Sequence, residues 1–229
     1  MTYAALLNML RHQPRSFLRD HYLKITVLPT EVFGQAQYYF GAQHDDPPQQ
    51  PMRWGVGPRT RGSKILNFVP LSYRGQLAPG DGNVPPTNIA PTNVLVVPTD
   101  FADTVPNFAA MNGNHMHHGP HIMITALLNG CTFCCANHPG GGVLMKHIRP
   151  RGALDHEVLA QRIGATGAFV NQVNGTFRFF GSGGHGYDAF TNDVTIVGVR
   201  RGGNWAVYAQ VHTKGVFDIL RVTRIFPPD

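Results

Sequence analysis

Alternation of apolar and polar positions is the clearest pattern in the chain, and it predicts β-strands. In DVTIVGVRR-GG-NWAVYAQVH (193–212), apolar residues recur at every second position on both sides of a Gly-Gly pair, which is typical of a β-hairpin. Other short apolar runs without helical spacing predict further strands. They lie at 21–40, where Pro29 separates two strands, and at 64–71, 93–97, 175–180 and 217–226.

Helical spacing is confined to two segments. Residues 3–19 place apolar side chains three and four positions apart until Pro14 interrupts the pattern. Residues 155–164 begin with Asp155, which suits an N-cap, and end at Gly164, which suits a helix C-terminus. Helices are therefore few, and strands make up most of the predicted structure.

The composition is typical of one folded domain. Hydrophobic residues make up 42% and charged residues 14% of the 229 positions, so the chain has enough apolar surface to bury a core. The 26 Gly and 18 Pro residues favour turns between short strands. We therefore expect a single domain over residues 1–229 of class α+β, a mainly antiparallel β-sandwich with two or three flanking helices.

The charge of the chain does not indicate a specific nucleic-acid site. The net charge is +6, but the Lys and Arg residues are scattered, and the densest clusters are 149–151 and Arg200-Arg201. A loose affinity for acidic surfaces is the simpler interpretation. No apolar run is long enough to span a bilayer, so we expect no membrane partner.

The stretch ALLNGCTFCCANHPGGGVLMKHIRP (126–150) contains all three cysteines and two histidines. Folded as strand–turn–strand about Pro139, it would pair 137 with 141, 135 with 143, 133 with 145 and Cys131 with His147. Residues directly opposite in antiparallel strands have Cβ atoms about 4.5–5.5 Å apart. A thiol and an imidazole at that distance can exchange a proton, which generates the nucleophilic thiolate, so we expect an exposed Cys131 thiol with a lowered pKa.

Three other interpretations of this stretch remain open. A zinc site would use Cys131, Cys134 and His138, but residues 131 and 134 point to opposite faces of a regular strand, and no second Cys pair is present. A redox pair would need a helix after the first cysteine. Cys134 and Cys135 are most simply buried strand residues, and on spacing alone Cys131 could be core as well.

The motif L-N-G-C at 128–131, followed by a strand, a Gly-rich turn and His147-Ile148, resembles a known toxin family. It is similar to the L-x-G-C and H-I motifs of the glutamine deamidase toxins, which include the Burkholderia lethal factor and the catalytic domain of the cytotoxic necrotizing factors. In the lethal factor a threonine lies six residues before the cysteine, as Thr125 does here. Asn129 replaces the motif serine, and the Cys-to-His separation of 16 is longer than in the lethal factor.

The resemblance implies that the protein deamidates a glutamine of another protein by acyl transfer. Cys131 would attack the amide, His147 would take the thiol proton and return it to ammonia, and Thr125 would hold the imidazole in the required tautomer. Backbone N–H groups near Gly130 and Cys131, with Asn129 as a further candidate, would stabilise the oxyanion. No metal and no organic cofactor would be required.

The same resemblance implies a toxin or effector with a protein substrate, for which a translation-initiation RNA helicase is the first candidate and a Rho-type GTPase is the alternative. We expect a monomer. The segment MTYAALLNMLRHQPRS has no features of a secretory signal, so we expect delivery that needs no such signal and action in the cytoplasm of a target cell. The alternatives are a thiol protease or transglutaminase with the same dyad, or a non-catalytic β-sandwich binding module in which Cys131 is core.

Two histidine-containing loops are secondary candidates. GSGGHG (181–186) lacks the Lys-Ser/Thr of a phosphate loop, so we expect a flexible rim where His185 or Tyr187 contacts substrate. HMHHGPH (115–121) holds four histidines and could bind a transition metal, although a solvated loop is the simpler interpretation. We therefore expect no metal site.

Overall fold

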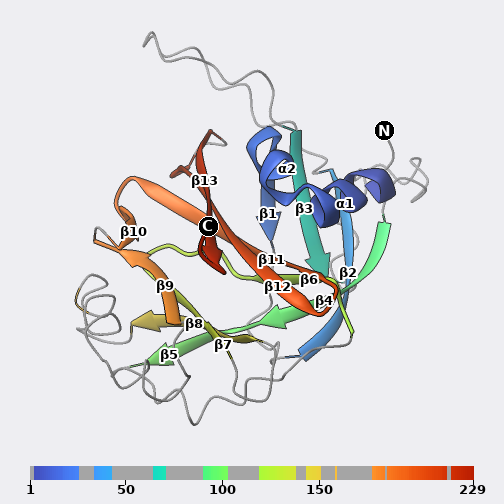
Figure 1. Ribbon diagram of the computed structural model, residues 1–229. Helices are drawn as coiled ribbons and strands as arrows, with labels where there is room; N and C mark the ends of the chain where they lie inside the picture. The colour runs from blue at the N-terminus through green and yellow to red at the C-terminus, as the bar shows by residue number, and fades with distance from the viewer. Residues whose placement is uncertain are drawn as a thin grey trace, which may run out of the picture.

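The computed structural model describes residues 3–25, 34–42, 64–70, 90–102, 119–137, 143–150, 158, 177–183, 185–215 and 218–229. Within these residues the chain forms two helices and two β-sheets (Figure 1). The helices are α1 (Tyr3–His12) and α2 (Pro14–Asp20). The strands are β1 (His21–Ile25), β2 (Gly34–Ala42), β3 (Lys64–Pro70), β4 (Ala90–Val97), β5 (Thr99–Ala102), β6 (Ile122–Thr125), β7 (Thr132–Asn137), β8 (Val143–Pro150), β9 (Phe177–Ser182), β10 (Gly186–Tyr187), β11 (Asn192–Arg201), β12 (Asn204–Thr213) and β13 (Ile219–Phe226).

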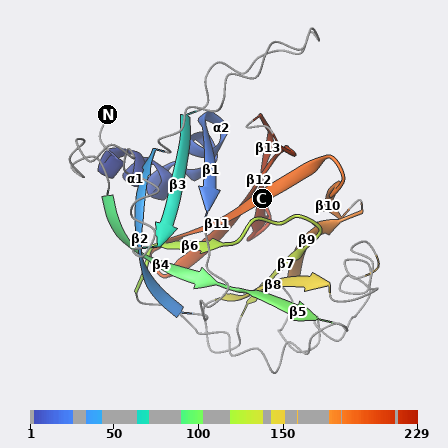
Figure 2. The same cartoon turned by 180° about the vertical axis from the view of Figure 1, so that it is seen from behind.

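The larger sheet has the order β1-β3-β2-β4-β6-β11-β12-β13, and the smaller one has the order β10-β9-β7-β8-β5. Most pairs are antiparallel; the parallel ones are β1 with β3, β4 with β6, β5 with β8 and β9 with β10. The helices lie on one side of the larger sheet and the smaller sheet lies on the other, as both views show (Figures 1 and 2). The larger sheet is therefore the middle layer.

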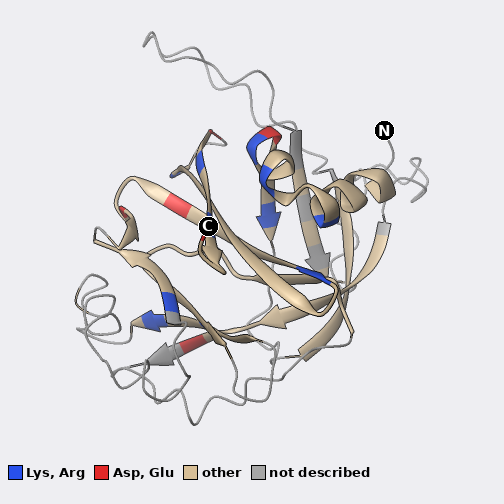
Figure 3. Cartoon of the chain, in the orientation of Figure 1, with Lys and Arg blue, Asp and Glu red and all other residues tan. Residues whose placement is uncertain are grey.

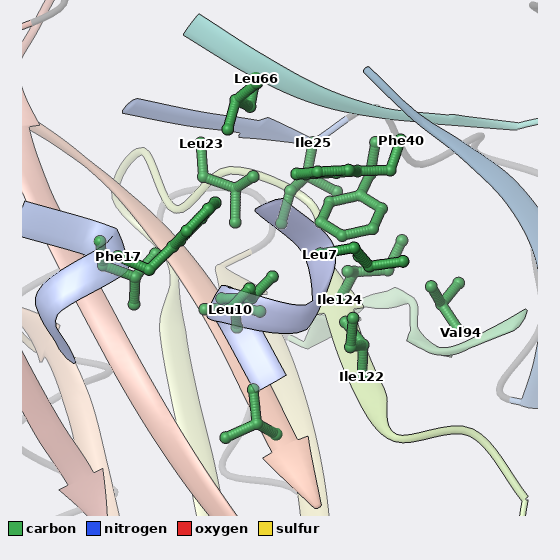
Figure 4. Close-up of a cluster of buried hydrophobic side chains, with 14 of the residues drawn as sticks. Leu7, Leu10, Phe17, Leu23, Ile25, Phe40, Leu66, Val94, Ile122 and Ile124 are labelled. Atoms are coloured by element: carbon green, nitrogen blue, oxygen red, sulfur yellow. The ribbon is translucent and has the colours of Figure 1, made fainter. Parts of the chain in front are cut away.

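Strand β4 shows why the middle layer is apolar on both faces. Val94 and Val96 point into a core beneath the helices, whereas Leu95 and Val97 point into a second core between the sheets. The first core packs Leu10 of α1 and other helix residues against the larger sheet (Figure 4). Because successive strand residues face opposite sides, a strand between two packed layers has to be apolar at nearly every position.

The predicted fold class is confirmed: the structure is mainly antiparallel, with two packed sheets and two helices. The predicted hairpin at 193–212 is present as β11 and β12, and Gly202 and Gly203 adopt φ of +53° and +85° in its turn. The segment 3–19 forms two helices instead of one, because Pro14 starts a new helix at its first position. Of the predicted helix at 155–164, only Val158 is described.

Among the described residues, neither helix is long and apolar enough to cross a membrane. Lys and Arg lie on α2 and on strands of both sheets rather than along a single element (Figure 3). This distribution agrees with the scattered basic positions in the sequence.

Candidate functional site

The expected pairing of Cys131 with His147 is wrong by two residues. In the β7–β8 hairpin, Phe133 lies opposite His147, and continuing this register by one pair puts Arg149 opposite Cys131. The last pair is Asn137 with Val143, so the whole Gly140–Gly142 run falls between the strands, where glycine is less costly than inside a ladder. The expected register would have placed one of these glycines in the ladder.

A shift of two residues preserves the alternation of faces. Cys131, Phe133 and Met145 accordingly belong to the same buried cluster between the sheets. Position 131 thus stays on the face of the hairpin that carries His147, as a diagonal neighbour. Diagonal neighbours are about 7–8 Å apart, so the two side chains are less close than the direct pairing implied.

His147 is held where the chain crosses twice from the larger sheet to the smaller one. One crossing joins β4 to β5 between Val97 and Thr99, and the other joins β6 to β7 after Thr125. Val97 pairs with Thr125 in the larger sheet, while Thr99 pairs with His147 in the smaller one. The two crossings therefore lie side by side and bring two threonine hydroxyls to the imidazole.

The hydrogen bonds of Thr125 determine the tautomer of neutral His147. The Thr125 hydroxyl lies 2.6 Å from the carbonyl oxygen of Val97 and 2.8 Å from Nδ1 of His147. A hydroxyl has one hydrogen, and a carbonyl can only accept, so Thr125 donates to Val97 and accepts from Nδ1–H. The hydroxyl oxygen of Thr99 lies 3.3 Å from the same Nδ1 atom. The neutral ring therefore carries its proton on Nδ1, and Nε2 has the free lone pair.

Nε2 of His147 is buried and has no hydrogen-bond partner among the described residues. Burial, together with the nearby positive charge of Arg149, lowers the pKa of His147 to about 3. The imidazole is therefore neutral near pH 7. Nε2 of His147 can therefore accept a proton, and no described residue donates a hydrogen bond to it.

The Cys131 thiol is buried, which corrects the expectation of an exposed thiol with a lowered pKa. Its residue is only 3% exposed, and burial raises its pKa more than a backbone hydrogen bond at Asn129 and the charge of Arg149 lower it. Arg149 thus favours the thiolate and disfavours the imidazolium. With the thiol pKa raised and the imidazole pKa lowered, the neutral forms of Cys131 and His147 are both favoured near pH 7.

The turn that carries Cys131 is fixed by backbone and side-chain contacts. Leu128 exchanges two backbone hydrogen bonds with Val194, of 2.8 and 3.0 Å, and Gly130 has φ of +85°, which favours glycine. The Tyr187 hydroxyl donates to the carbonyl oxygen of Cys131 at 2.8 Å. The Asn129 side chain accepts from Nζ of Lys214 at 2.9 Å. Asn129 therefore contributes to this turn through its side chain as well as through its backbone.

The two expected rim residues lie in different environments. Tyr187 is buried at 4% exposure, and its ring stacks on Phe180 at 6.0 Å between centroids. It belongs to the same buried cluster as Cys131. His185 is half-buried, and its ring lies 5.3 Å from that of Phe179. Tyr187 is therefore no rim residue, whereas a contact of His185 with substrate stays a prediction.

Thr99 and Arg149 were not predicted from the sequence. Thr99 reaches His147 through a parallel pairing between strands 48 residues apart, for which the local sequence carries no signal. Arg149 had a weak signal, since it follows His147 by two positions on a predicted strand and therefore shares its side.

The described residues contain no group of three or more His, Cys, Asp or Glu side chains placed to hold a metal ion. Cys134 and Cys135 are fully buried strand residues. The zinc ligand considered above, His138, lies outside the described residues, as do His115, His117 and His118. His121 is exposed, and its Nδ1 lies 3.3 Å from the carbonyl oxygen of Arg200. The absence of metal therefore stays a prediction.

Alkylation should distinguish the three thiols. Cys131 is 3% exposed and Cys134 and Cys135 are 0% exposed, so iodoacetamide should label Cys131 first near neutral pH. Labelling at Cys131 should slow in Arg149→Gln, because the charge that lowers the thiol pKa is lost. Peptide mass spectrometry over time measures each rate. Equal rates at the three thiols would contradict a reactive Cys131.

The two buried histidines should make folding stability fall with acid. The folded pKa is lowered to about 3 for His147 and about 4 for His212, whereas both rise to near 6.5 on unfolding. These two histidines therefore bind protons more tightly in the unfolded chain, and the free energy of unfolding falls as the pH drops below about 6.5. The loss is about 2 kcal/mol per histidine at about pH 5. Burial raises the pKa of Asp193, which opposes the trend.

Urea unfolding at several pH values tests this dependence. The variant His212→Gln should have a shallower fall in unfolding free energy between about pH 6.5 and 5 than the parent protein. The exposed His12 serves as control, and His12→Gln should leave the fall unchanged. Parallel curves for all three proteins would show that His212 does not titrate as its burial implies.

Comparison with known proteins adds no family assignment: the sequence matches no protein family model, and it has no significant match among curated proteins. The likeness to the glutamine deamidase toxins thus rests on the residues between 125 and 150.

Proposed function

We propose that this protein is a cysteine-dependent hydrolase that deamidates glutamine side chains of a protein substrate. Cys131 is the nucleophile, His147 is the general base and acid, and Thr125 is a positioning residue. The observation that carries the proposal is the Thr125 hydroxyl 2.8 Å from Nδ1 of His147, because it leaves the buried Nε2 free to accept a proton. The L-N-G-C motif supplies the thiol on the same face of the hairpin.

In the proposed reaction, Cys131 and His147 act in two stages. Nε2 of His147 takes the thiol proton while Sγ of Cys131 adds to the glutamine amide carbon. Backbone N–H groups of the turn at Gly130 and Cys131 would stabilise the oxyanion. The proton on Nε2 passes to the amide nitrogen, ammonia leaves, and a thioester remains. Water then attacks the thioester as Nε2 removes its proton, the C–S bond breaks, and Nε2 returns the proton to Sγ, which leaves a glutamate side chain on the substrate and restores the thiol.

The electrostatics of the site favour proton transfer during attack over a preformed ion pair. The pKa of Cys131 is raised and that of His147 is lowered to about 3, so thiolate and imidazolium are both disfavoured before substrate binds. Cys131 is also only 3% exposed, so substrate reaches Sγ only after the residues packed over it move. A protein substrate supplies the binding energy for such a displacement more readily than a free amino acid does.

The expected biological role is that of a toxin or effector in the cytoplasm of a target cell. The resemblance favours a translation-initiation RNA helicase as substrate, with a Rho-type GTPase as the second choice. Each candidate is incubated with the protein, and its intact mass and ammonia release are measured. Deamidation gives a small mass gain with equimolar ammonia, proteolysis gives fragments, and transglutamination requires an added amine. No mass change in any glutamine-containing protein tested would count against the proposal.

A second candidate function is favoured by one observation, the burial of the Cys131 thiol. A non-catalytic β-sandwich binding module would hold this cysteine as a small core residue, as Cys134 and Cys135 are held. Its activity would then survive replacement of the thiol.

A further inference from the structure

A cleft of about 360 Å³ opens where α1 and α2 meet strands β11, β12 and β13. Its described lining residues include none from the Cys131 site. Ligand sites for small molecules start at about this size, near 300 Å³. The cleft is therefore a candidate binding site that the proposed deamidation does not use.

The lining of the cleft is strongly basic. Arg15, Arg201 and Arg224 contribute guanidinium groups and His12 adds an imidazole, while no Asp or Glu is among the described lining residues. Three arginines from α2, β11 and β13 converge on this one cleft, although basic residues are elsewhere spread over the molecule (Figure 3). Guanidinium groups suit phosphate and carboxylate oxygens, since their planar donors can form paired hydrogen bonds.

One carboxylate already lies against this basic lining. The side chain of Asp229 is 3.2 Å from Nη1 of Arg15 and 3.6 Å from Nη1 of Arg224. Asp229 is 54% exposed, so both ion pairs are screened by water and cost little to break. Its carboxylate shows where a ligand anion would lie and leaves two of the three guanidinium charges uncompensated.

Arg224 also retains a donor without an acceptor. Its Nε is buried and has no hydrogen-bond partner among the described residues. A buried donor left unpaired is destabilising unless a ligand or water satisfies it. The Asp229 carboxylate does not fill this role, because at 3.6 Å from the Nη1 of Arg224 it is beyond ordinary hydrogen-bond length.

We propose that this cleft binds a phosphate monoester carried on a planar apolar group. A phosphate monoester has a charge of about −1.5 to −2 near neutral pH, which matches the uncompensated charge better than a single carboxylate does. Ala206 and Tyr208 of β12 also line the cleft, on the face of the larger sheet that packs against the helices, and Tyr208 provides an apolar wall for the group that bears the phosphate. On binding, the phosphate displaces the Asp229 carboxylate from Arg15 and Arg224.

Calorimetric titration with phenyl phosphate at low ionic strength tests the proposal. Benzoate, with the same ring and one charge, should bind more weakly. Arg15→Gln and Arg224→Gln should each weaken phenyl phosphate binding about tenfold. Asp229→Asn should strengthen it, because the competing carboxylate is removed, and an improvement in affinity does not arise from misfolding. Cys131→Ser should bind like the parent protein.

Arg19→Gln is the matched control, since Arg19 lies on the same helix as Arg15, is exposed and does not line the cleft. It changes the net charge equally and should leave affinity unchanged. Absence of binding at about 10 mM phenyl phosphate would overturn the proposal. Equal affinities for benzoate and phenyl phosphate would overturn the assignment to phosphate. Equal losses of phenyl phosphate affinity in Arg19→Gln and Arg224→Gln would show only a general attraction to the positive charge of the protein, and would overturn the proposed site.

Discussion

The Cys131→Ser variant is expected to fold like the parent protein and to lose glutamine deamidation by at least about 10³-fold. A serine hydroxyl is a far weaker nucleophile than a thiol and gives up its proton far less readily to an imidazole whose pKa is lowered to about 3. The side chain loses little volume, and a buried hydroxyl costs about 1–2 kcal/mol of stability. Target mass, ammonia release and thermal melting are measured together.

Cys134→Ser is the matched control for this variant. Cys134 is fully buried in β7, so its replacement should destabilise the fold at least as much as that of Cys131 and leave turnover of the folded protein intact. The binding-module alternative predicts that Cys131→Ser keeps any toxicity and target binding. A well-folded Cys131→Ser variant with undiminished toxicity would therefore end the deamidase proposal.

The parts of the fold that could be predicted are those with a local signal. The β11–β12 hairpin combines alternation with a Gly-Gly turn, and both can be seen within 193–212. The order of the strands has no such signal. β4 pairs with β6, and β5 pairs with β8, in parallel and across long sequence separations. A strand such as β4, which is buried on both faces, has no alternation of apolar and polar residues from which its neighbours could be predicted.

The candidate site was predicted in its residues but not in its geometry. Thr125 and His147 came from the spacing of a motif, and the structure joins them by a hydrogen bond. The β7–β8 register was missed because a run of three glycines between the strands allows turns of different length. The raised pKa of Cys131 was missed because it depends on burial among residues distant in sequence, such as Tyr187 of the same core cluster.

Thr125→Val is expected to lower kcat at least about 10²-fold with little change in KM. Valine keeps the shape of threonine but removes the hydroxyl that accepts from Nδ1 of His147 and donates to Val97. The remaining acceptor, Thr99, is more distant at 3.3 Å, so the Nδ1–H tautomer loses its main support. A proton on Nε2 would make that nitrogen unable to accept from the thiol. Turnover is measured on the folded fraction.

A purely structural role for Thr125 makes a different prediction, which the serine variant reveals. Thr125→Ser retains the hydroxyl and should recover most of kcat, although it loses a buried methyl group and hence about 1 kcal/mol of stability. Nitrogen NMR of the His147 ring reports the tautomer directly, with Nε2 unprotonated in the parent and serine proteins and protonated in the valine variant. If Thr125→Val loses stability but keeps kcat and the parent tautomer, Thr125 only packs, and the base must be oriented by Thr99 or by another group.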